Sequence, residues 1–208
     1  METIIYVIRH SETFENYEKT EYEPLNQAII LSENGENKAK QLSQKLLEKE
    51  NIDIVYSSDY ARAMSTAKYF CSKDTKGVYV DSRFGERKIG IEDKFISSKE
   101  YCKLQFTDLE YKFPKGECAR EVKERFTAGI NEILQKNIGK KIILITHGAA
   151  MGFYFQSVCE DYRINEINKC RTISFNRKII FDGIIQRPDI FKLTFENQKL
   201  KDLIHVEQ

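Results

Sequence analysis

The chain has 208 residues, of which 41% are hydrophobic and 31% are charged, as in an ordinary soluble globular protein. Its 33 lysines and arginines nearly balance its 32 aspartates and glutamates, so its net charge of +1 excludes a global electrostatic attraction to nucleic acid or to an anionic membrane. Any anion chemistry must therefore come from a local cluster of cations.

Three features of the chain bear on its location and organisation. The first residues have too short an apolar run for a signal peptide, and no stretch approaches the roughly 18 apolar residues that a membrane span needs. The five cysteines are odd in number and form no C-x-x-C motif, which is typical of reduced thiols rather than of a disulfide framework. We therefore expect a cytoplasmic protein in which residues 1–208 form a single domain, with an excursion or lid at about 91–115.

Apolar runs of strand length recur along the chain. In chain order, the first four expected strands are residues 3–8, 52–56, 77–80 and 141–146. Nearly continuous apolar runs are typical of strands that are covered on both faces, as in a mostly parallel sheet. After Cys170, three more runs predict strands, one or more of them antiparallel, at residues 171–175, 177–181 and 190–195.

Helical patterns lie between the first four runs. Apolar residues at helical spacing occur within residues 39–46, 63–70, 122–134 and about 149–159. Ser32 or Asn34 would cap the first of these helices, and Asp59 precedes the second. The alternation of strands and helices predicts an α/β fold with right-handed crossovers.

Charged side chains follow each of the first four expected strands. Arg9 and His10 come directly after the first strand, and Arg62 lies in the first turn of the helix after the second. The third strand leads to Glu86, and His147 follows the fourth. Because ligands of an open parallel sheet bind beyond the carboxyl ends of the strands, we expect these five side chains to meet at one edge. Two arginines, two histidines and a carboxylate predict a phosphate site with an acid beside it.

These residue types suit phosphoryl transfer. Arginine forks match phosphate oxygens and stay charged, and arginines around a histidine leave its imidazole neutral and able to act as a nucleophile. A second histidine can donate to the equatorial oxygens of the transferring group, and a carboxylic acid can protonate the leaving alkoxide. With three histidines in the chain and no spaced pairs of ligands, a metal hydrolase is not expected.

Several longer motifs occur in order from residue 4 to about 150. "RHSETFEN" is similar to R-H-G-E-T-x-x-N, "YSSDYARAMSTA" to S-S-x-x-x-R-A-x-x-T-A, and "THG" to a second histidine motif. "PLN" with "LSENGENKA", "FGERKIG" and "PKGECAREVKERF" match the elements between them. The ordered set resembles the histidine phosphatase superfamily, in its phosphoglycerate-mutase-like branch. This resemblance implies a three-layer α/β/α sandwich with a mostly parallel central sheet.

The resemblance also implies a role for each matching residue. His10 would be the phosphorylated nucleophile, and Arg9, Arg62 and His147 would form the phosphate pocket. Glu86 would be the proton donor. No metal or organic cofactor is implied.

Four further positions match the family or depart from it. Asn16 matches an asparagine that often contacts the phosphate, and Glu117 matches a glutamate near the pocket, although helix capping is an equally good role for it. Ser11 stands where the family usually has glycine, which allows a positive φ or a close backbone approach. Its hydroxyl could face the ligand, or the substitution could lower activity. Cys118 replaces a serine.

The expected function is that of a metal-independent phosphatase, which hydrolyses a small phosphomonoester through a phosphohistidine intermediate. Its partners would then be that substrate and inorganic phosphate, with no nucleic acid and no membrane; composition does not distinguish a monomer from an oligomer. One alternative is a phosphoglycerate mutase, favoured by the adjacent Glu86 and Arg87 but not by the short segment from Gly90 to Gly116. Another is a weakly active or inactive domain that binds phosphorylated ligands or a protein, supported only by Ser11.

Some charged residues near these motifs have two possible roles. Arg83, Arg87 and Lys88 would either recognise anionic groups of the substrate or form a solvated loop. His205 lies in a charged stretch and is expected to be non-catalytic.

Overall fold

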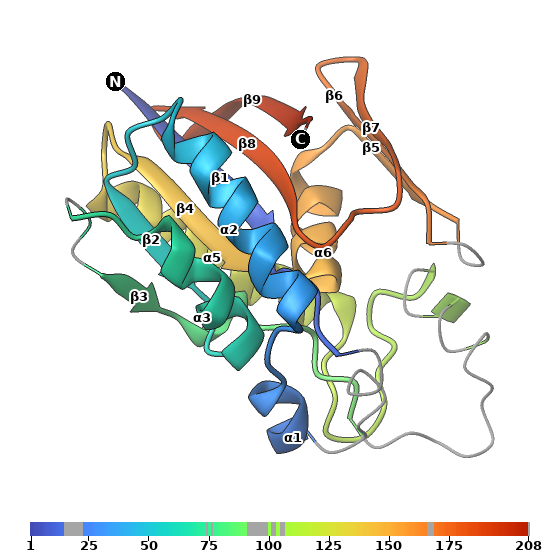
Figure 1. Cartoon of the computed structure of the whole chain (residues 1–208). Helices are drawn as coiled ribbons and strands as arrows, with labels where there is room; N and C mark the ends of the chain where they lie inside the picture. Colours follow the sequence, from blue (N-terminus) through green and yellow to red (C-terminus); the bar gives the residue numbers. More distant parts are fainter. Residues whose placement is uncertain are drawn as a thin grey trace.

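The centre of the computed structural model is a six-stranded sheet in the order β3-β2-β4-β1-β8-β9 (Figure 1). The structure describes residues 1–14, 23–73, 75, 77–90, 100, 103–104, 107–165 and 169–207. The strands of the sheet are β1 (Glu2–Arg9), β2 (Ile54–Ser57), β3 (Val78–Val80), β4 (Lys141–Thr146), β8 (Asp189–Glu196) and β9 (Lys199–Val206). The first four are parallel, and β8 and β9 add an antiparallel pair beside β1. The prediction of a mostly parallel sheet is confirmed.

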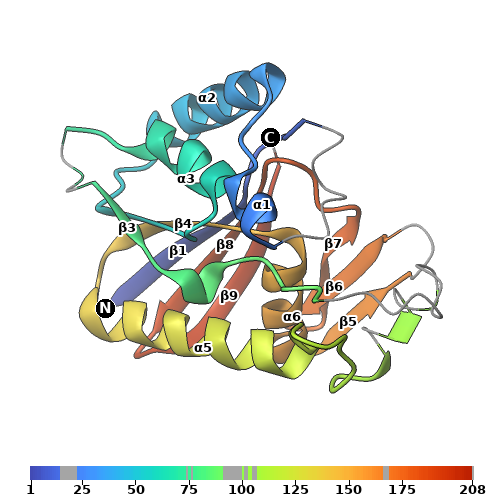
Figure 2. The same cartoon turned by 90° about the horizontal axis from the view of Figure 1, so that it is seen from below.

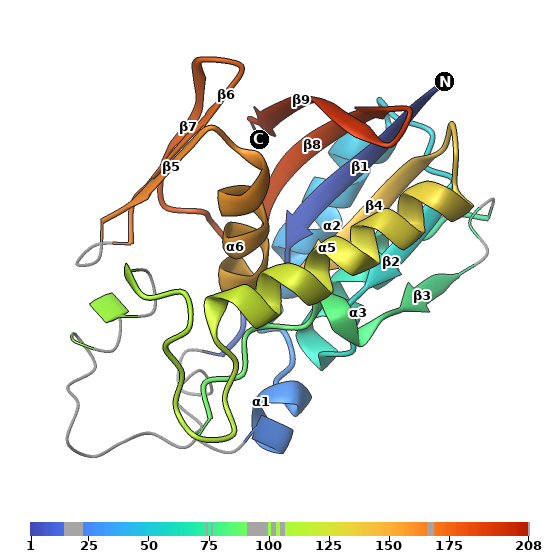
Figure 3. The same cartoon turned by 180° about the vertical axis from the view of Figure 1, so that it is seen from behind.

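Helices cover both faces of this sheet and complete a three-layer sandwich. Figure 2 shows α2 (Glu33–Leu47) and α3 (Ala61–Ala67) on one face, and α5 (Ala119–Lys136) and α6 (Gly148–Val158) on the other. Seen from behind, α5 and α6 lie across the sheet (Figure 3). The short elements are α1 (Glu23–Ala28) and the 3-10 turns η2 (Lys68–Phe70) and η3 (Ser82–Phe84).

The apolar runs of the central strands β1 and β4 are continuous because these strands pack into two cores, one on each face of the sheet. In β1, Ile5 and Val7 pack into the cluster under α5 and α6, whereas Tyr6 and Ile8 pack into the cluster under α2 and α3. All four are at most 1% exposed. Since successive side chains of a strand point to opposite faces, a strand between two helical layers needs apolar residues at every position.

Two predicted helix starts can be compared with the structure. Ser32 caps α2, because its hydroxyl oxygen accepts the backbone N–H of Gly35 at 3.0 Å. The helix after Asp59 has Tyr60 at its N-cap instead, without a side-chain bond. The carboxylate of Asp59 therefore does not cap α3.

The C-terminal strands are divided between two sheets. The runs at 171–175 and 177–181 lie in a separate antiparallel sheet made of β5 (Asp161–Ile164), β6 (Arg171–Phe175) and β7 (Lys178–Gly183). The run at 190–195 is part of β8, which is antiparallel to β1, as predicted for one or more of these runs. Strands β5 and β9 were not predicted, since both mix charged and apolar residues at the edges of their sheets, where one side needs no apolar cover.

Several predictions fall outside the described residues. Asn16 and Cys102 lie there, as does most of the expected excursion at about 91–115. In the part of the chain that the structure does describe, the four remaining cysteines form no disulfide, and none of the helices has the length and the apolar character of a membrane span.

Candidate active site

The five charged residues predicted to meet do lie together at the carboxyl edge of the sheet. Arg9 is the last residue of β1 and His10 follows it, Arg62 lies in α3 after β2, and His147 links β4 to α6. The rings of His10 and His147 are 5.1 Å apart between centroids, and Nε of Arg62 lies 3.3 Å from Nε2 of His10. Glu86 reaches the same place from the segment after η3, because its carboxylate contacts the first turn of α6.

His10 is held as a neutral imidazole with Nε2 toward the arginine. Its Nδ1 lies 2.7 Å from the carbonyl oxygen of Ser11, which can only accept, so Nδ1 carries the proton and Nε2 keeps its lone pair. The side chain is 4% exposed. Burial and the positive charges of Arg62 and Arg9 lower the pKa of His10 well below its usual value. The Nε2 lone pair is therefore ready for nucleophilic attack at neutral pH.

Arg62 is fixed by contacts on both sides of its guanidinium. Its Nη1 donates to the backbone oxygen of Asn26 at 2.7 Å and to the side-chain oxygen of the same residue at 3.2 Å. The guanidinium carbon lies 4.7 Å from the ring centroid of Tyr60. Asn26 belongs to the "PLN" motif, but its spacing alone gave no sign that it would position Arg62.

His147 presents a buried hydrogen-bond donor to the cluster. Its Nε2 lies 2.7 Å from the hydroxyl of Ser58, whose oxygen also accepts the backbone N–H of Tyr60. Since Nε2 is the one acceptor within reach of this hydroxyl among the described residues, we assign the hydroxyl proton to the bond with Nε2. The proton of the neutral ring is then on Nδ1, which is buried and has no hydrogen-bond partner among the described residues. Burial and the charge of Arg62 lower the pKa of His147 well below its usual value. An oxygen of a bound phosphoryl group is a suitable acceptor for this Nδ1–H.

Arg9 lies against the start of α6. A Cβ atom at Gly148 would come within 3.1 Å of the guanidinium carbon of Arg9, so glycine at this position leaves room for the guanidinium beside the helix. Nη1 of Arg9 donates to the carbonyl oxygen of Ile185 at 2.7 Å. The glycine of "THG" thus serves the packing of Arg9 and not a special backbone conformation.

Ser11 is accommodated without strain and does not face a ligand. It is fully buried, its φ lies outside the left-handed region, and its hydroxyl donates to the carbonyl oxygen of Gly35 at 2.7 Å. Its backbone N–H donates to Oγ1 of Thr66 at 3.0 Å. The close backbone approach occurs instead at Gly35, where a Cβ would collide with the carbonyl oxygen of Glu12.

Glu86 is held by backbone donors at the N-terminus of α6. Its carboxylate oxygens accept the N–H groups of Ala150 at 3.0 Å, Ala149 at 3.3 Å and Arg87 at 2.9 Å. It borders a hollow of about 160 Å³, which is lined by Gln27, Asp59, Tyr60, Ser82, Arg83, Gly85, Glu86, Lys88, Glu117 and Arg125. The hollow gives space for a small molecule beside the carboxylate of Glu86.

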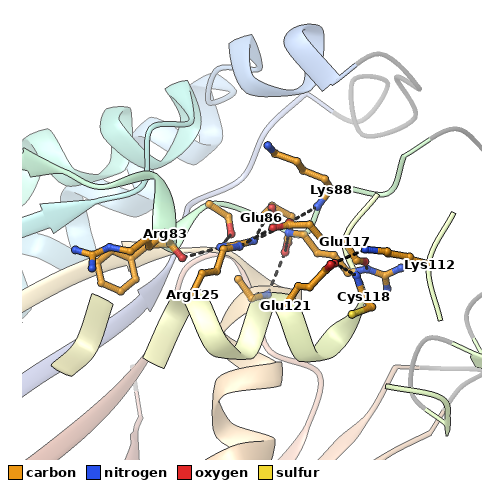
Figure 4. Close-up of polar contacts among 12 residues, drawn as sticks. Arg83, Glu86, Lys88, Lys112, Glu117, Cys118, Glu121 and Arg125 are labelled. Carbon is orange, nitrogen blue, oxygen red and sulfur yellow. Dashed lines mark hydrogen bonds and ion pairs between the residues drawn. The ribbon is translucent and has the colours of Figure 1, made fainter. Parts of the chain in front are cut away.

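Arg125, on α5, holds the loop that carries Glu86 (Figure 4). Its guanidinium donates to three backbone carbonyl oxygens, those of Arg83 at 2.6 Å, Gly85 at 3.0 Å and Glu86 at 3.2 Å. Its other N–H groups bind both carboxylate oxygens of Glu117, at 2.8 and 3.0 Å. The motif "PKGECAREVKERF" contains Arg125, but the role of this residue depends on contacts with a distant loop, at separations of 39 to 42 positions.

Glu117 does not cap the helix. The backbone N–H of Cys118, the N-cap of α5, is bound by Glu121 at 2.9 Å. Glu117 instead pairs with Arg125 and accepts the backbone N–H of Lys88 at 2.9 Å. Of its two predicted roles, capping is wrong, and the glutamate supports the segment beside the hollow.

The cations after Glu86 have different environments. Arg83 forms ion pairs with Asp81 at 2.6 Å and Glu132 at 2.7 Å. Arg87 is 3% exposed and its Nε donates to the carbonyl oxygen of Glu117 at 2.8 Å, so it is not part of a solvated loop. Lys88 is exposed and lines the hollow, where it can approach an anionic substrate.

Replacing Arg125 with methionine should lower kcat about 10- to 100-fold and leave KM little changed. The loop of Glu86 would lose its three carbonyl contacts, and the carboxylate of Glu117 would lose its partner, which should cost about 2–3 kcal/mol of stability. The measurement is phosphatase kinetics together with thermal unfolding. Arg120→Met is the matched control, because this arginine of the same helix forms exposed ion pairs and should change neither value appreciably. Lower stability with an unchanged kcat would limit Arg125 to a structural role.

The two buried histidines should make the protein unstable in mild acid. Because the pKa values of His10 and His147 are lowered by folding, the unfolded chain binds protons below about pH 6.5 that the folded chain does not. Stability should be full above that pH and should fall on acidification by about 1.4 kcal/mol per pH unit for each histidine. Thermal unfolding between pH 7.5 and roughly 5, in buffer without phosphate, measures this. His147→Gln should show a shallower slope, and equal slopes would contradict the assignment.

The chain belongs to the histidine phosphatase superfamily (branch 1), whose family model matches residues 5–174. Among curated relatives, it is 28% identical over 188 residues to phosphoglycerate mutase-like protein 4 of Arabidopsis thaliana, covering 86% of this chain and 80% of the relative. It is 27% identical over 161 residues to a probable phosphoglycerate mutase of Serratia proteamaculans, covering 74% of each. The resemblance seen in the motifs is therefore confirmed at the level of the family.

Solved structures share the fold at low sequence identity. A phosphoserine phosphatase mutant of Entamoeba histolytica, in complex with phosphoserine, superposes with a TM-score of 0.65 at 18% identity, over 97% of this chain and 96% of that one. A mycobacterial glucosyl-3-phosphoglycerate phosphatase, complexed with VO3, gives a TM-score of 0.67 at 17% identity, over 98% and 96%. These similarities confirm the phosphoglycerate-mutase-like α/β fold.

Proposed function

We propose that the protein is a phosphatase that hydrolyses a small phosphomonoester through a phosphohistidine at His10. The observation that carries the proposal is the state of His10, which is buried and neutral, with Nδ1 bound to a backbone carbonyl oxygen and Nε2 only 3.3 Å from Arg62. The Nε–H of Arg62 donates to this Nε2, so a permanent cation and the lone pair of a buried, neutral histidine converge on one point. A phosphoryl group bound there would satisfy both.

The first half of the reaction forms the phosphoenzyme. Nε2 of His10 attacks phosphorus while the bond to the ester oxygen breaks, and Arg9, Arg62 and Nδ1–H of His147 stabilise the charge on the equatorial oxygens. Glu86 gives a proton to the departing alkoxide. Because Glu86 borders the hollow, its proton would lie next to the alcohol portion of a substrate bound in that hollow.

The second half releases phosphate. Glu86, now a carboxylate, takes a proton from a water molecule, which attacks phosphorus and breaks its bond to Nε2. His10 returns to its neutral form, and inorganic phosphate leaves. The described residues contain no group of three or more histidine, cysteine or acidic side chains that could hold a metal ion, and the proposed chemistry uses this chain's own residues.

Phosphoglycerate mutase activity is the second candidate. This candidate is supported by the similarity of the chain to two curated relatives, a phosphoglycerate mutase-like protein and a probable phosphoglycerate mutase. Arg87, which follows Glu86 in the manner of a mutase, is buried and donates to the backbone of Glu117. The third reading, a binding domain with little activity, loses its only sequence support because Ser11 bonds to Gly35 and Thr66 without strain.

A panel of phosphomonoesters, assayed for kcat/KM in the presence of EDTA, tests the proposal, with the His10→Ala variant as its control. Turnover should survive chelation. Incubation of 3-phosphoglycerate with catalytic amounts of 2,3-bisphosphoglycerate separates the two activities, because a phosphatase releases phosphate and a mutase isomerises the substrate. Isomerisation without phosphate release would establish the mutase instead.

A further inference from the structure

The connection between β7 and β8 passes beside the phosphate pocket and contacts Arg9. Strand β8 lies next to β1 and is antiparallel to it, and its first residue, Asp189, pairs with Arg9, the last residue of β1 (Figure 1). Ile185, in the connection itself, is fully buried, and its carbonyl oxygen accepts Nη1–H of Arg9 at 2.7 Å. A backbone group of this connection therefore holds one of the arginines of the pocket.

A single peptide unit links Arg9 to the carboxylate of Asp189. The carbonyl group of Ile185 and the N–H group of Gln186 belong to one planar amide, so neither can turn without the other. Arg9 donates to the carbonyl oxygen, and Oδ2 of Asp189 accepts the N–H at 2.9 Å. The carboxylate thus sets the direction in which the carbonyl oxygen points toward Arg9.

The carboxylate of Asp189 is itself held firmly. Its side chain is 4% exposed, and Oδ1 accepts the backbone N–H of Ile190 at 3.1 Å and lies 2.6 Å from Nε2 of His205. An ionised carboxylate only accepts hydrogen bonds, so Nε2 donates to it. The ring of His205 packs on Phe181 and Phe191, with centroids 4.8 and 5.0 Å away. His205, expected to be non-catalytic, therefore orients the carboxylate, and strands β7, β8 and β9 together fix its position.

The orientation of Arg9 depends on its bond to the peptide unit. On the side of α6, a Cβ atom at Gly148 would come within 3.1 Å of the guanidinium carbon, so the guanidinium packs against the start of the helix. Packing of this kind limits tilting of the guanidinium, whereas the bond from Nη1 to Ile185 limits its rotation. Because a guanidinium binds phosphate through a planar fork of N–H groups, a rotation would misalign these groups with the phosphoryl oxygens.

Both hydrogen bonds of the peptide unit involve a charged group. The carboxylate of Asp189 at one end and the guanidinium of Arg9 at the other polarise the amide between them in the same sense, which strengthens both bonds. The residues that support Arg9 in this way lie after residue 174, where the match to the family model ends. This support is therefore separate from the motifs that carry the family resemblance.

We propose that Asp189 is a positioning residue of the active site, which orients Arg9 through the peptide unit of Ile185 and Gln186. This rests on the proposed phosphatase function, in which Arg9 stabilises the phosphoryl group in the transition state. Without the carboxylate, the peptide unit is free to rotate, and its carbonyl oxygen no longer holds Nη1 in place. The loss concerns the phosphoryl group and is therefore the same whatever alcohol the substrate carries.

Asp189→Leu removes the acceptor and keeps a side chain of similar size. It should lower kcat/KM about 10- to 50-fold, equally for para-nitrophenyl phosphate and for an alkyl phosphate. Asp189→Asn keeps an oxygen that can accept the N–H of Gln186, and it should stay within about threefold of the wild type. His205→Asn should lose less activity than Asp189→Leu, because the carboxylate keeps its bond to Gln186.

A double-mutant cycle with Arg9→Met distinguishes positioning of Arg9 from a general structural effect. If Asp189 acts through Arg9, the double variant Arg9→Met/Asp189→Leu should be no less active than Arg9→Met alone. Additive losses in the double variant would overturn the proposal. So would equal activities of Asp189→Leu and Asp189→Asn.

Asp53→Leu is the matched control. The carboxylate of Asp53 likewise accepts a backbone N–H, that of Lys141 at 2.9 Å, but this bond lies at the start of β4 and thus at the opposite edge of the sheet. The control should lower the thermal stability and leave kcat/KM unchanged. An equal loss of kcat/KM in Asp53→Leu and Asp189→Leu would show that destabilisation causes the loss, against a role through Arg9.

A binding measurement keeps this inference separate from the proposed function. By calorimetry, Asp189→Leu and Arg9→Met should each bind orthovanadate, an analogue of the transferring phosphoryl group, about tenfold more weakly, and the double variant no more weakly than Arg9→Met. If the wild-type protein binds orthovanadate but turns over no phosphomonoester, the phosphatase proposal fails, while the binding cycle still decides the role of Asp189. Equal affinities of the wild type and Asp189→Leu would refute this role even in an active phosphatase.

Discussion

His10→Ala should release no measurable phosphate from para-nitrophenyl phosphate, a loss of roughly 10⁴- to 10⁶-fold in kcat. The reason is that, of the three histidines in the chain, only His10 presents a nitrogen lone pair to the cluster. His147 turns its Nε2 to Ser58, which leaves only a donor facing the cluster, and the third histidine, His205, is paired with Asp189. Neither can replace the Nε2 lone pair of His10.

Two further measurements would show that the loss of activity comes from the loss of the nucleophile. Wild-type protein quenched in alkali during turnover should gain the mass of one phosphoryl group, on a peptide that contains His10, and the variant should gain none. His205→Asn is the matched histidine control and should retain activity within about tenfold, because its effect reaches the pocket only through the β7–β8 segment. Substantial turnover by His10→Ala would remove the covalent mechanism altogether.

Glu86→Gln should slow the hydrolysis of an alkyl phosphate by about 10²- to 10⁴-fold. An alkoxide needs a proton as it leaves, and the side-chain amide of glutamine is too weak an acid to supply one. Para-nitrophenolate leaves without help, so phosphorylation of His10 by para-nitrophenyl phosphate should be nearly unaffected. The second step still needs a base, and so the variant should show a burst of one para-nitrophenolate per active site before slow turnover.

The glutamine keeps an oxygen that can accept the backbone N–H groups of α6, so the fold of the loop should persist. Asp59→Asn is the matched control. Asp59 lines the same hollow, and its Oδ1 is buried with no hydrogen-bond partner in the part of the chain that the structure describes. Were Asp59 the acid, its variant would show the burst and Glu86→Gln would not.

Much of the fold could be predicted because its main strands are buried on both faces. Strand β4, residues 141–146, was predicted with its observed bounds, since a strand between two helical layers must be apolar throughout. The edge strands β5 and β9 were missed for the converse reason. Each exposes part of its surface, and charged residues there obscure the apolar period.

The sequence by itself determined the family and the set of charged residues at the sheet edge, because the parallel strands of one sheet all end at that edge and bring the next residues of the chain together there. Only the tertiary structure decided how those residues are held. Ser58 and His147 are separated by 89 positions, Arg62 and Asn26 by 36, and Arg9 and Ile185 by 176. Such contacts arise from packing between distant segments, and no local pattern encodes them. Packing also assigned the close backbone approach to Gly35 rather than to the position of Ser11.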